Sequence, residues 1–164
     1  MNKKRGQAAM EFLMTYGWAI LVVLIAIGAL AYFGVLNPGR FLPASCTITP
    51  GISCEDFQAV DTTDTVSITL RNGMGDDLSN VSISVNEPDS TTTVCNLTCS
   101  SGCTGAGSDT MADGQLATWT SAVCTGGNGV GTQGSRFKAD ILFTYTGSGG
   151  LSHTKTGSMT TQVE

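Results

Sequence analysis

The sequence predicts an α+β protein in which a long N-terminal hydrophobic α-helix precedes an antiparallel, Ig-like β-sandwich head domain. An almost unbroken apolar run extends from Phe12 to Leu36, directly after a basic patch. Beyond residue 45, apolar and polar side chains alternate in several short segments separated by glycine-rich turns, which is typical of antiparallel strands. The 119 residues that follow the first 45 of the 164 suffice for one globular domain with its own core.

The chain divides into four parts: a basic leader over residues 1–6, a hydrophobic helix over 7–36, a hinge over 37–45 and an extracellular head over 46–164. An apolar stretch of roughly 20 residues spans a bilayer as a helix, so this one spans it with some tilt. Asn37-Pro38-Gly39 ends the helix, because Pro38 lacks an N–H and disfavours helical geometry at the preceding residue.

The basic patch predicts how the helix is oriented. Lys3, Lys4 and Arg5 precede the apolar run, so the positive-inside rule places the amino end in the cytoplasm and the head outside. A secretory signal peptide fits less well, because its apolar region is about 7 to 15 residues long and ends in an A-x-A-like cleavage site. An uncleaved signal anchor fits the length of the run and remains an alternative.

Glu11 is the acidic residue at the start of the apolar run. A carboxylate carried to the bilayer centre costs on the order of 2.5 to 3.5 kcal/mol, and a plain anchor has no use for it. If the chain is cut between Gly6 and Gln7, however, the new α-amino group lies one helical turn from Glu11, or within reach of the Glu11 of a neighbouring copy. The cut also removes the basic patch, which leaves an apolar rod able to pack against identical rods.

The order Lys-Lys-Arg-Gly6, Gln7, Glu11 and apolar helix resembles the class III signal sequences of type IV pilin-like proteins, and the segment QAAMEFLMTYGWAILV is similar to archaeal prepilins. The resemblance implies that a prepilin peptidase cleaves after Gly6, that Gln7 becomes the amino terminus and that Glu11 serves assembly. It further implies a homo-oligomeric helical filament for adhesion or motility, with the subunit in the cell membrane before assembly and in an extracellular surface filament afterwards. The subunit would be the substrate of an enzyme rather than an enzyme, with a β-rich head.

The rival interpretation is an uncleaved, single-pass, signal-anchored membrane protein whose extracellular β-sandwich binds a ligand or senses one. The two hypotheses differ at one point, because the rival keeps residues 1–6.

Alternation places several strands in the head. Val66, Ile68 and Leu70 share one face, and so do Val81, Ile83 and Val85 beyond a turn-rich segment, so we expect a β-hairpin of residues 65–71 and 80–86. A second hairpin is expected from residues 137–145 and 151–163 around the turn at 147–150. Weaker strands are expected near 56–60 and 115–123. Residues 95–114 and 124–135 are rich in Gly, Ser and Thr, so we expect surface loops there.

All six cysteines follow the apolar run: Cys46, Cys54, Cys95, Cys99, Cys103 and Cys124. An even number on the presumed exterior indicates disulfides in an oxidising compartment. We favour the pairs 46–54, 99–103 and 95–124, although six cysteines allow 15 pairings and the sequence does not select one. Two N-x-S/T sequons, at Asn80 and Asn96, lie in the same region and predict glycosylation of an exported head.

The remaining chemistry argues against other functions. The net charge is −5, and residues 7–164 carry five basic and thirteen acidic side chains, so a nucleic-acid partner is not expected. The spacing of Cys95, Cys99 and Cys103 does not match a zinc site, and we expect neither a metal nor a cofactor. His153 is the only histidine, and we expect it exposed on a strand. Asp76 and Asp77 lack an EF-hand register, and no catalytic motif or phosphate-binding loop is present.

Overall fold

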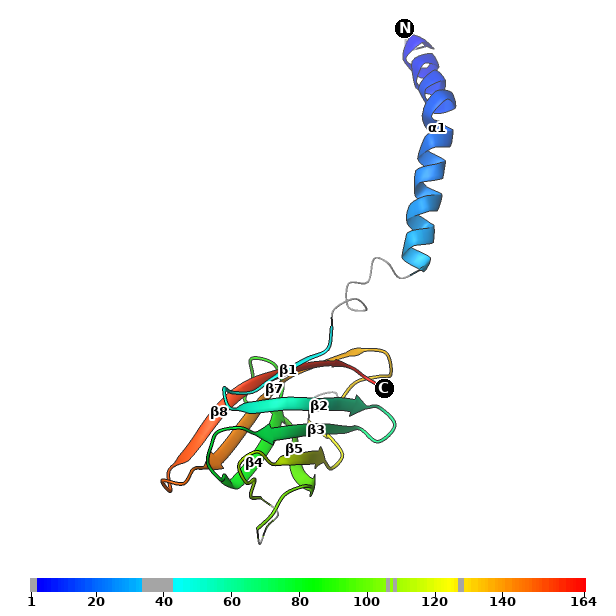
Figure 1. Ribbon diagram of the computed structural model, residues 1–164. Coiled ribbons are helices and arrows are strands. Elements are labelled where there is room, and N and C mark those ends of the chain that lie inside the picture. The colour runs from blue at the N-terminus through cyan, green and yellow to red at the C-terminus, as the bar shows by residue number, and fades with distance from the viewer. Residues whose placement is uncertain (1–2, 34–42, 106, 108, 127–128) are drawn as a thin grey trace. The chain divides into compact units, whose positions relative to one another are not determined.

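The computed structural model describes residues 3–33, 43–105, 107, 109–126 and 129–164. The chain separates into two compact units, residues 1–42 and 43–164, and each is described by itself (Figure 1). The hinge predicted at 37–45 lies outside the described residues as far as Leu42, as does the end of the predicted helix at 34–36.

The first unit contains helix α1, Lys3–Tyr32, of 30 residues. Its segment Ala9–Tyr32 is 24 residues long and apolar enough to cross a membrane, and none of its most apolar window is buried. Leucine, isoleucine and valine side chains therefore project from every side of the helix. In water this arrangement is unfavourable, since burying each such side chain stabilises a protein by about 1.5 to 3 kcal/mol. The helix therefore favours a lipid environment or the apolar surface of a protein.

The second unit is an eight-stranded antiparallel sheet, which we call the head (Figure 1). Its strands are β1 Ser45–Thr47, β2 Ile52–Val60, β3 Thr65–Asn72, β4 Ser79–Asn86, β5 Thr93–Ser101, β6 Leu116–Ser121, β7 Arg136–Thr146 and β8 Ser152–Gln162. They are hydrogen-bonded in the order β1-β8-β7-β4-β5-β6-β3-β2. A helix followed by an antiparallel β domain is thus confirmed, whereas the two-layer sandwich is not, because all eight strands belong to one sheet.

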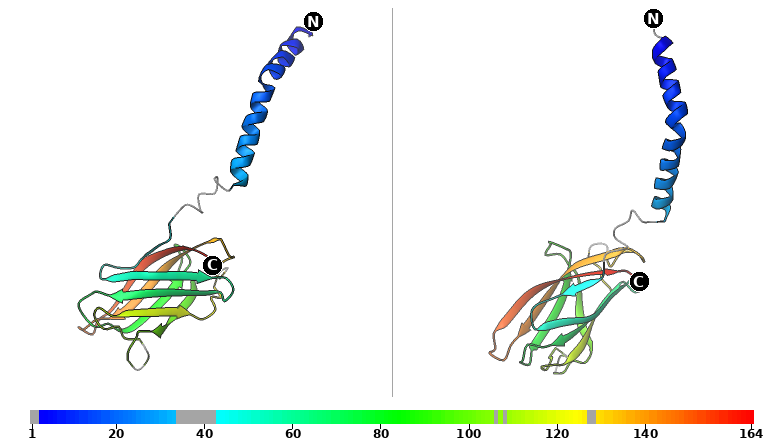
Figure 2. Two further views of the ribbon diagram at one scale, coloured as in Figure 1. Left: turned by 45° about the vertical axis from the view of Figure 1, so that its right-hand side comes forward. Right: turned by 45° about the horizontal axis from the view of Figure 1, so that its top comes forward.

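The sheet curls until its two edges meet, so that it forms a nearly closed barrel (Figure 2). At one point of this seam, a disulfide joins Cys46 on the edge strand β1 to Cys54 on the edge strand β2. At another, Ala59 of β2 forms a parallel bridge with Val163, and the Glu164 N–H donates to the Ala59 carbonyl at 2.9 Å. Closing the seam removes most of the free strand edge that an open sheet would expose.

The interior of the barrel is a single apolar core. Alternate residues of β3, β4, β6 and β7 point inward, as the period of a strand requires, whereas residues 152–156 of β8 are all exposed. The largest fully buried side chains are Phe143, Ile68, Leu70, Leu78, Ile83, Met111, Ile141, Met159, Val66, Val85, Val130 and Val163. The polar Asn72 is also fully buried, and its Nδ2 donates to the carbonyls of Asp76 at 2.8 Å and Met111 at 3.1 Å. This amide therefore holds two loops together at one end of the barrel.

The hairpin expected from residues 65–71 and 80–86 is wrong. The two segments are strands with the predicted inward faces, but β3 pairs with β2 and β6, whereas β4 pairs with β5 and β7. The inward faces follow from alternation alone, whereas the pairing depends on which strands meet around the barrel. The second expected hairpin is confirmed, since β7 and β8 pair from Arg136–Gln162 to Thr146–Ser152 around the turn at 147–150.

The loop expected at 95–114 is also partly wrong, because its first seven residues belong to β5. Cys95 is buried, Leu97 is buried and Cys99 is half-buried, while Asn96 and Thr98 are exposed. This alternation appears in the sequence once the cysteines are counted as apolar residues, which is how a bridged cysteine packs. The weaker strands expected near 56–60 and 115–123 correspond to β2 and β6.

Candidate functional sites

The N-terminal part of α1 holds the predicted processing and assembly residues. Gly6 and Gln7 lie within the helix, and Gln7 and Glu11 are four residues apart, which is one helical turn. The side chain of Glu11 is exposed. The hydroxyl of Thr15 donates to the backbone carbonyl of Glu11 at 2.8 Å. The Thr15 proton is thus used on the main chain rather than on the Glu11 carboxylate.

One face of α1 carries an apolar groove in the part of the helix that follows Glu11. It is lined by Phe12, Tyr16, Ala19, Ile20, Val23 and Leu24. These positions recur every three or four residues, so they form one continuous stripe along the helix. The rings of Phe12 and Tyr16 lie 4.7 Å apart at one end, and Ala19 provides a shallow position between larger side chains. The stripe has the size and composition to receive another apolar helix or lipid chains.

The three disulfides match the pairs favoured from the sequence. Cys46 is bonded to Cys54, Cys95 to Cys124 and Cys99 to Cys103. The Cys95–Cys124 bond lies in the core, where both residues are more than nine-tenths buried. It fixes the loop that follows β6 to strand β5. Because Cys95, Cys99 and Cys103 are all bridged, none of them offers a thiolate to a zinc ion.

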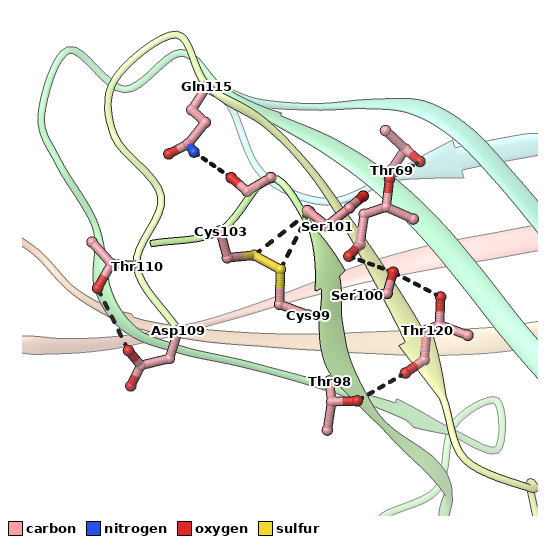
Figure 3. Close-up of a disulfide and its surroundings, with 12 residues drawn as sticks. Thr69, Thr98, Cys99, Ser100, Ser101, Cys103, Asp109, Thr110, Gln115 and Thr120 are labelled. Carbon is pink, nitrogen blue, oxygen red and sulfur yellow. Dashed lines mark hydrogen bonds between the residues drawn. A yellow bond between two sulfur atoms is a disulfide. The ribbon is translucent and has the colours of Figure 1, made fainter. Parts of the chain in front are cut away.

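The Cys99–Cys103 bond is closer to the surface and connects the end of β5 to the loop that follows this strand (Figure 3). The Ser101 carbonyl oxygen lies 3.3 Å from the Cys99 sulfur. The Gln115 side-chain amide donates to the Gly102 carbonyl. Gly102 has φ +77°, and a side chain at this position would collide with the Leu116 carbonyl. The small ring is therefore packed directly against the start of β6.

The pairing of β1 with β8, beside the seam, also depends on Gly157, a residue that the sequence did not single out. The segment that follows β1 crosses β8 at this residue, and a Cβ there would lie 2.6 Å from the Ile48 Cα and even closer to the Thr47 carbonyl oxygen. Only glycine leaves room for this crossing. A glycine in the interior of an expected strand was the available signal, since it often marks a close approach of another backbone segment.

Acidic side chains of the head mainly organise loops. Asp64 accepts from the Val130 N–H at 2.8 Å, and Asp61 accepts from the Gln133 N–H at 3.0 Å. At the other end of the barrel, Asp113 accepts from the Gly75 N–H, and Asp77 accepts from the Asp113 N–H, both at 2.9 Å. Within the described part of the chain, no group of three or more His, Cys, Asp or Glu could hold a metal ion.

His153 lies on β8 and is exposed, as expected from the sequence. Its ring is 5.3 Å from the ring of Tyr145, its partner on β7. No acidic or nucleophilic side chain is hydrogen-bonded to it among the interactions of the described residues. The geometry therefore assigns it a packing contact at the edge of the sheet.

Comparison with protein-family models and with curated proteins found no match for this chain.

Proposed function

We propose that this protein is a type IV pilin-like subunit that is cleaved after Gly6 by a prepilin peptidase and assembles through α1 into an extracellular filament for adhesion or motility. The observation that carries the proposal is the apolar segment Ala9–Tyr32, whose most apolar window contains no buried residue, with the single carboxylate Glu11 near its start. Such a rod is stable in a bilayer, and equally among copies of itself once the basic leader has been removed.

The position of Glu11 supports assembly rather than simple anchoring. Its carboxylate is four residues from Gln7, which would carry the new α-amino group after cleavage. A charge pair in an apolar environment interacts more strongly than one in water, but both charges first have to lose their hydration. The pair therefore sets the register between copies, while burial of the apolar stripe supplies the affinity.

The structure of the head supports a domain that works outside the cell. Three disulfides bridge all six cysteines, and such bonds persist in oxidising compartments. An Ig-like relationship of the head remains part of the proposal. It is supported by the packing of opposite walls of the curled sheet across one core, as the layers of a sandwich pack.

The second candidate is an uncleaved, signal-anchored protein with an extracellular β domain. The length of Ala9–Tyr32 favours it equally, because 24 apolar residues are enough for one span. Amino-terminal sequencing and intact-mass measurement of the protein from its native membranes distinguish the two. We expect a chain that begins at Gln7, and a mature chain that still begins at Met1 would refute the pilin hypothesis.

A further inference from the structure

The two N-x-S/T sequons lie on two neighbouring strands of the head, on the outward face of the sheet. Asn80 and Ser82 belong to β4, and Asn96 and Thr98 belong to β5. All four side chains are exposed, whereas the middle residues of the two sequons, Val81 and Leu97, are 4% and 5% exposed. Because side chains alternate along a strand, each asparagine and the hydroxyl two residues later face the solvent together.

The register places the sequons close to each other. Ile83 pairs with Leu97, and Ser84 pairs with Asn96. Asn80 is four residues from Ser84, so the two asparagines are roughly 13 Å apart along the strand direction. Groups attached to them would cover one continuous area, which we call the β4–β5 wall and define by the outward residues Asn80, Ser82, Ser84, Asn96, Thr98 and Ser100.

The β4–β5 wall carries no charged or aromatic side chain. Protein interfaces depend on aromatic and arginine residues that fill pockets in the partner, and this wall offers none. Its side chains are instead small and polar, and all of them except Ser84 are exposed. The composition thus favours a surface that stays in solvent over a surface that docks another protein.

The two sequons differ in their backbone. Asn80 has φ +48° and lies where the pairing of β4 with β7 shifts between Ser79 and Ser82. Its side-chain amide makes only a long hydrogen bond, 3.4 Å, to the hydroxyl of Thr146. Asn96, by contrast, is paired with Ser84 of β4, and β5 pairs with β6 from Leu97 onward. The Thr98 hydroxyl of its sequon donates to the Thr120 carbonyl at 3.3 Å.

We propose that Asn80 and Asn96 both carry N-linked glycans, that Asn80 accepts its glycan in the folded head, and that Asn96 accepts its glycan before β5 joins the sheet. In each transfer, a bond forms between Nδ2 and the anomeric carbon of a lipid-linked oligosaccharide phosphate. The bond from that carbon to the phosphate oxygen breaks, the lipid phosphate leaves with the electron pair, and the amide loses one proton. The enzyme must bind the asparagine and the hydroxyl together. In the folded sheet, Asn96 is paired with Ser84 and Thr98 with Thr120, whereas Asn80 lies in the gap of the β4–β7 register between Ser79 and Ser82.

The first test is mass spectrometry of intact protein and of its peptides from native membranes. We expect one glycan on Asn80 and one on Asn96. Asn80→Gln, Ser82→Ala, Asn96→Gln and Thr98→Ala should each reduce the mass by one glycan, whereas Ser84→Ala, a hydroxyl of the same wall outside both sequons, and Ser82→Thr should not. Finding either asparagine unmodified overturns the proposal that the β4–β5 wall carries two glycans.

The second test addresses the order of the two transfers. Full-length protein is produced in a host without N-glycosylation. It is prepared in two forms, folded in detergent with its disulfides intact, and reduced and unfolded. Each form is incubated with native membranes that contain the transferase and its lipid-linked donor. We expect the folded protein to be modified at Asn80 at least tenfold more than at Asn96, and the unfolded protein at both. Equal modification of Asn96 in the folded protein overturns the proposed order.

Discussion

Cys46 and Cys54 lie on the two opposite edge strands of the sheet, and the bond between them holds their Cα atoms 5.9 Å apart. The bond therefore closes the circumference of the barrel covalently. Cys46 is opposite Met159 of β8, and Cys54 is opposite Leu70 of β3. Both partners are fully buried core residues, so the disulfide at the seam joins two positions that pair with the core.

Removing the disulfides one at a time should destabilise the head in a defined order. The bonds span sequence separations of 29, 8 and 4 residues. Loop-closure entropy then predicts losses of about 3.6 kcal/mol for the Cys95–Cys124 pair, about 2.6 for Cys46–Cys54 and about 2 for Cys99–Cys103. Paired Cys→Ala variants, unfolded in urea and followed by Trp119 fluorescence in a Trp18→Phe background, would measure this order. An unchanged midpoint without the Cys46–Cys54 bond would contradict the role given to the seam.

Gly157→Ala should destabilise the head by about 1 to 3 kcal/mol, because the new methyl group meets the backbone of residues 47 and 48 rather than a movable side chain. Gly147→Ala is the matched control, since nothing lies within 4 Å of a Cβ at that turn position. The control should change the stability by no more than about 0.5 kcal/mol. Urea midpoints compare the two variants, and equal midpoints would mean that the crossing at Gly157 can move aside.

Glu55 should titrate below its ordinary pKa. The Arg71 Nε donates to the Glu55 carboxylate at 3.0 Å, and the Ser53 hydroxyl donates at the same distance. These hydrogen bonds, the one from Arg71 first, lower the pKa of Glu55. Because the folded state favours the ionised form, its stabilising effect is present above the ordinary carboxyl pKa and is lost as the pH falls through the lowered value. Arg71→Ala should raise the Glu55 pKa in an NMR titration, and Lys138→Ala should leave it unchanged.

Glu11→Ala should leave cleavage intact while filament assembly decreases. A charge-assisted hydrogen bond contributes about 1.5 to 3 kcal/mol, so we expect at least a tenfold lower yield of filaments. Amino-terminal sequencing reports the cleavage, and electron microscopy of the surface fraction reports the assembly. Met10→Ala, the neighbouring exposed residue, is the control. Normal assembly of Glu11→Ala would show that the carboxylate has no part in packing.

The sequence predicted the elements of the head better than their arrangement. Strict alternation at Val66, Ile68 and Leu70 identified their strand and its buried face, because that pattern is local. It did not reveal that β3 pairs with β6 instead of β4, since pairing is decided by residues distant in the chain. Strand β5 was missed because the Gly, Ser and Thr content of residues 95–114 indicates a loop.

The functional residues show the same limit. The position of Glu11 followed from a carboxylate within an apolar run, which is visible in one short segment. Gly157 matters because residues 47 and 48 cross it, more than 100 residues away in the chain. Its place inside an expected strand indicates a close approach of another backbone segment but not which segment approaches. The Cys46–Cys54 pair at the seam was thus favoured from the sequence, whereas the meeting of β1 and β2 as the two edge strands was not.

The turn between β7 and β8 has a practical consequence. It is closed by a hydrogen bond of 2.9 Å from the Gly150 N–H to the Gly147 carbonyl, and no atom crowds a Cβ at Gly147, Gly149 or Gly150. The first residues of the head, from Ser45, pair near the opposite end of β8, at Thr160. A short epitope or a fluorescent label inserted at this glycine turn would thus lie at the end of β8 opposite to Ser45, and it offers a site for imaging single subunits in living cells.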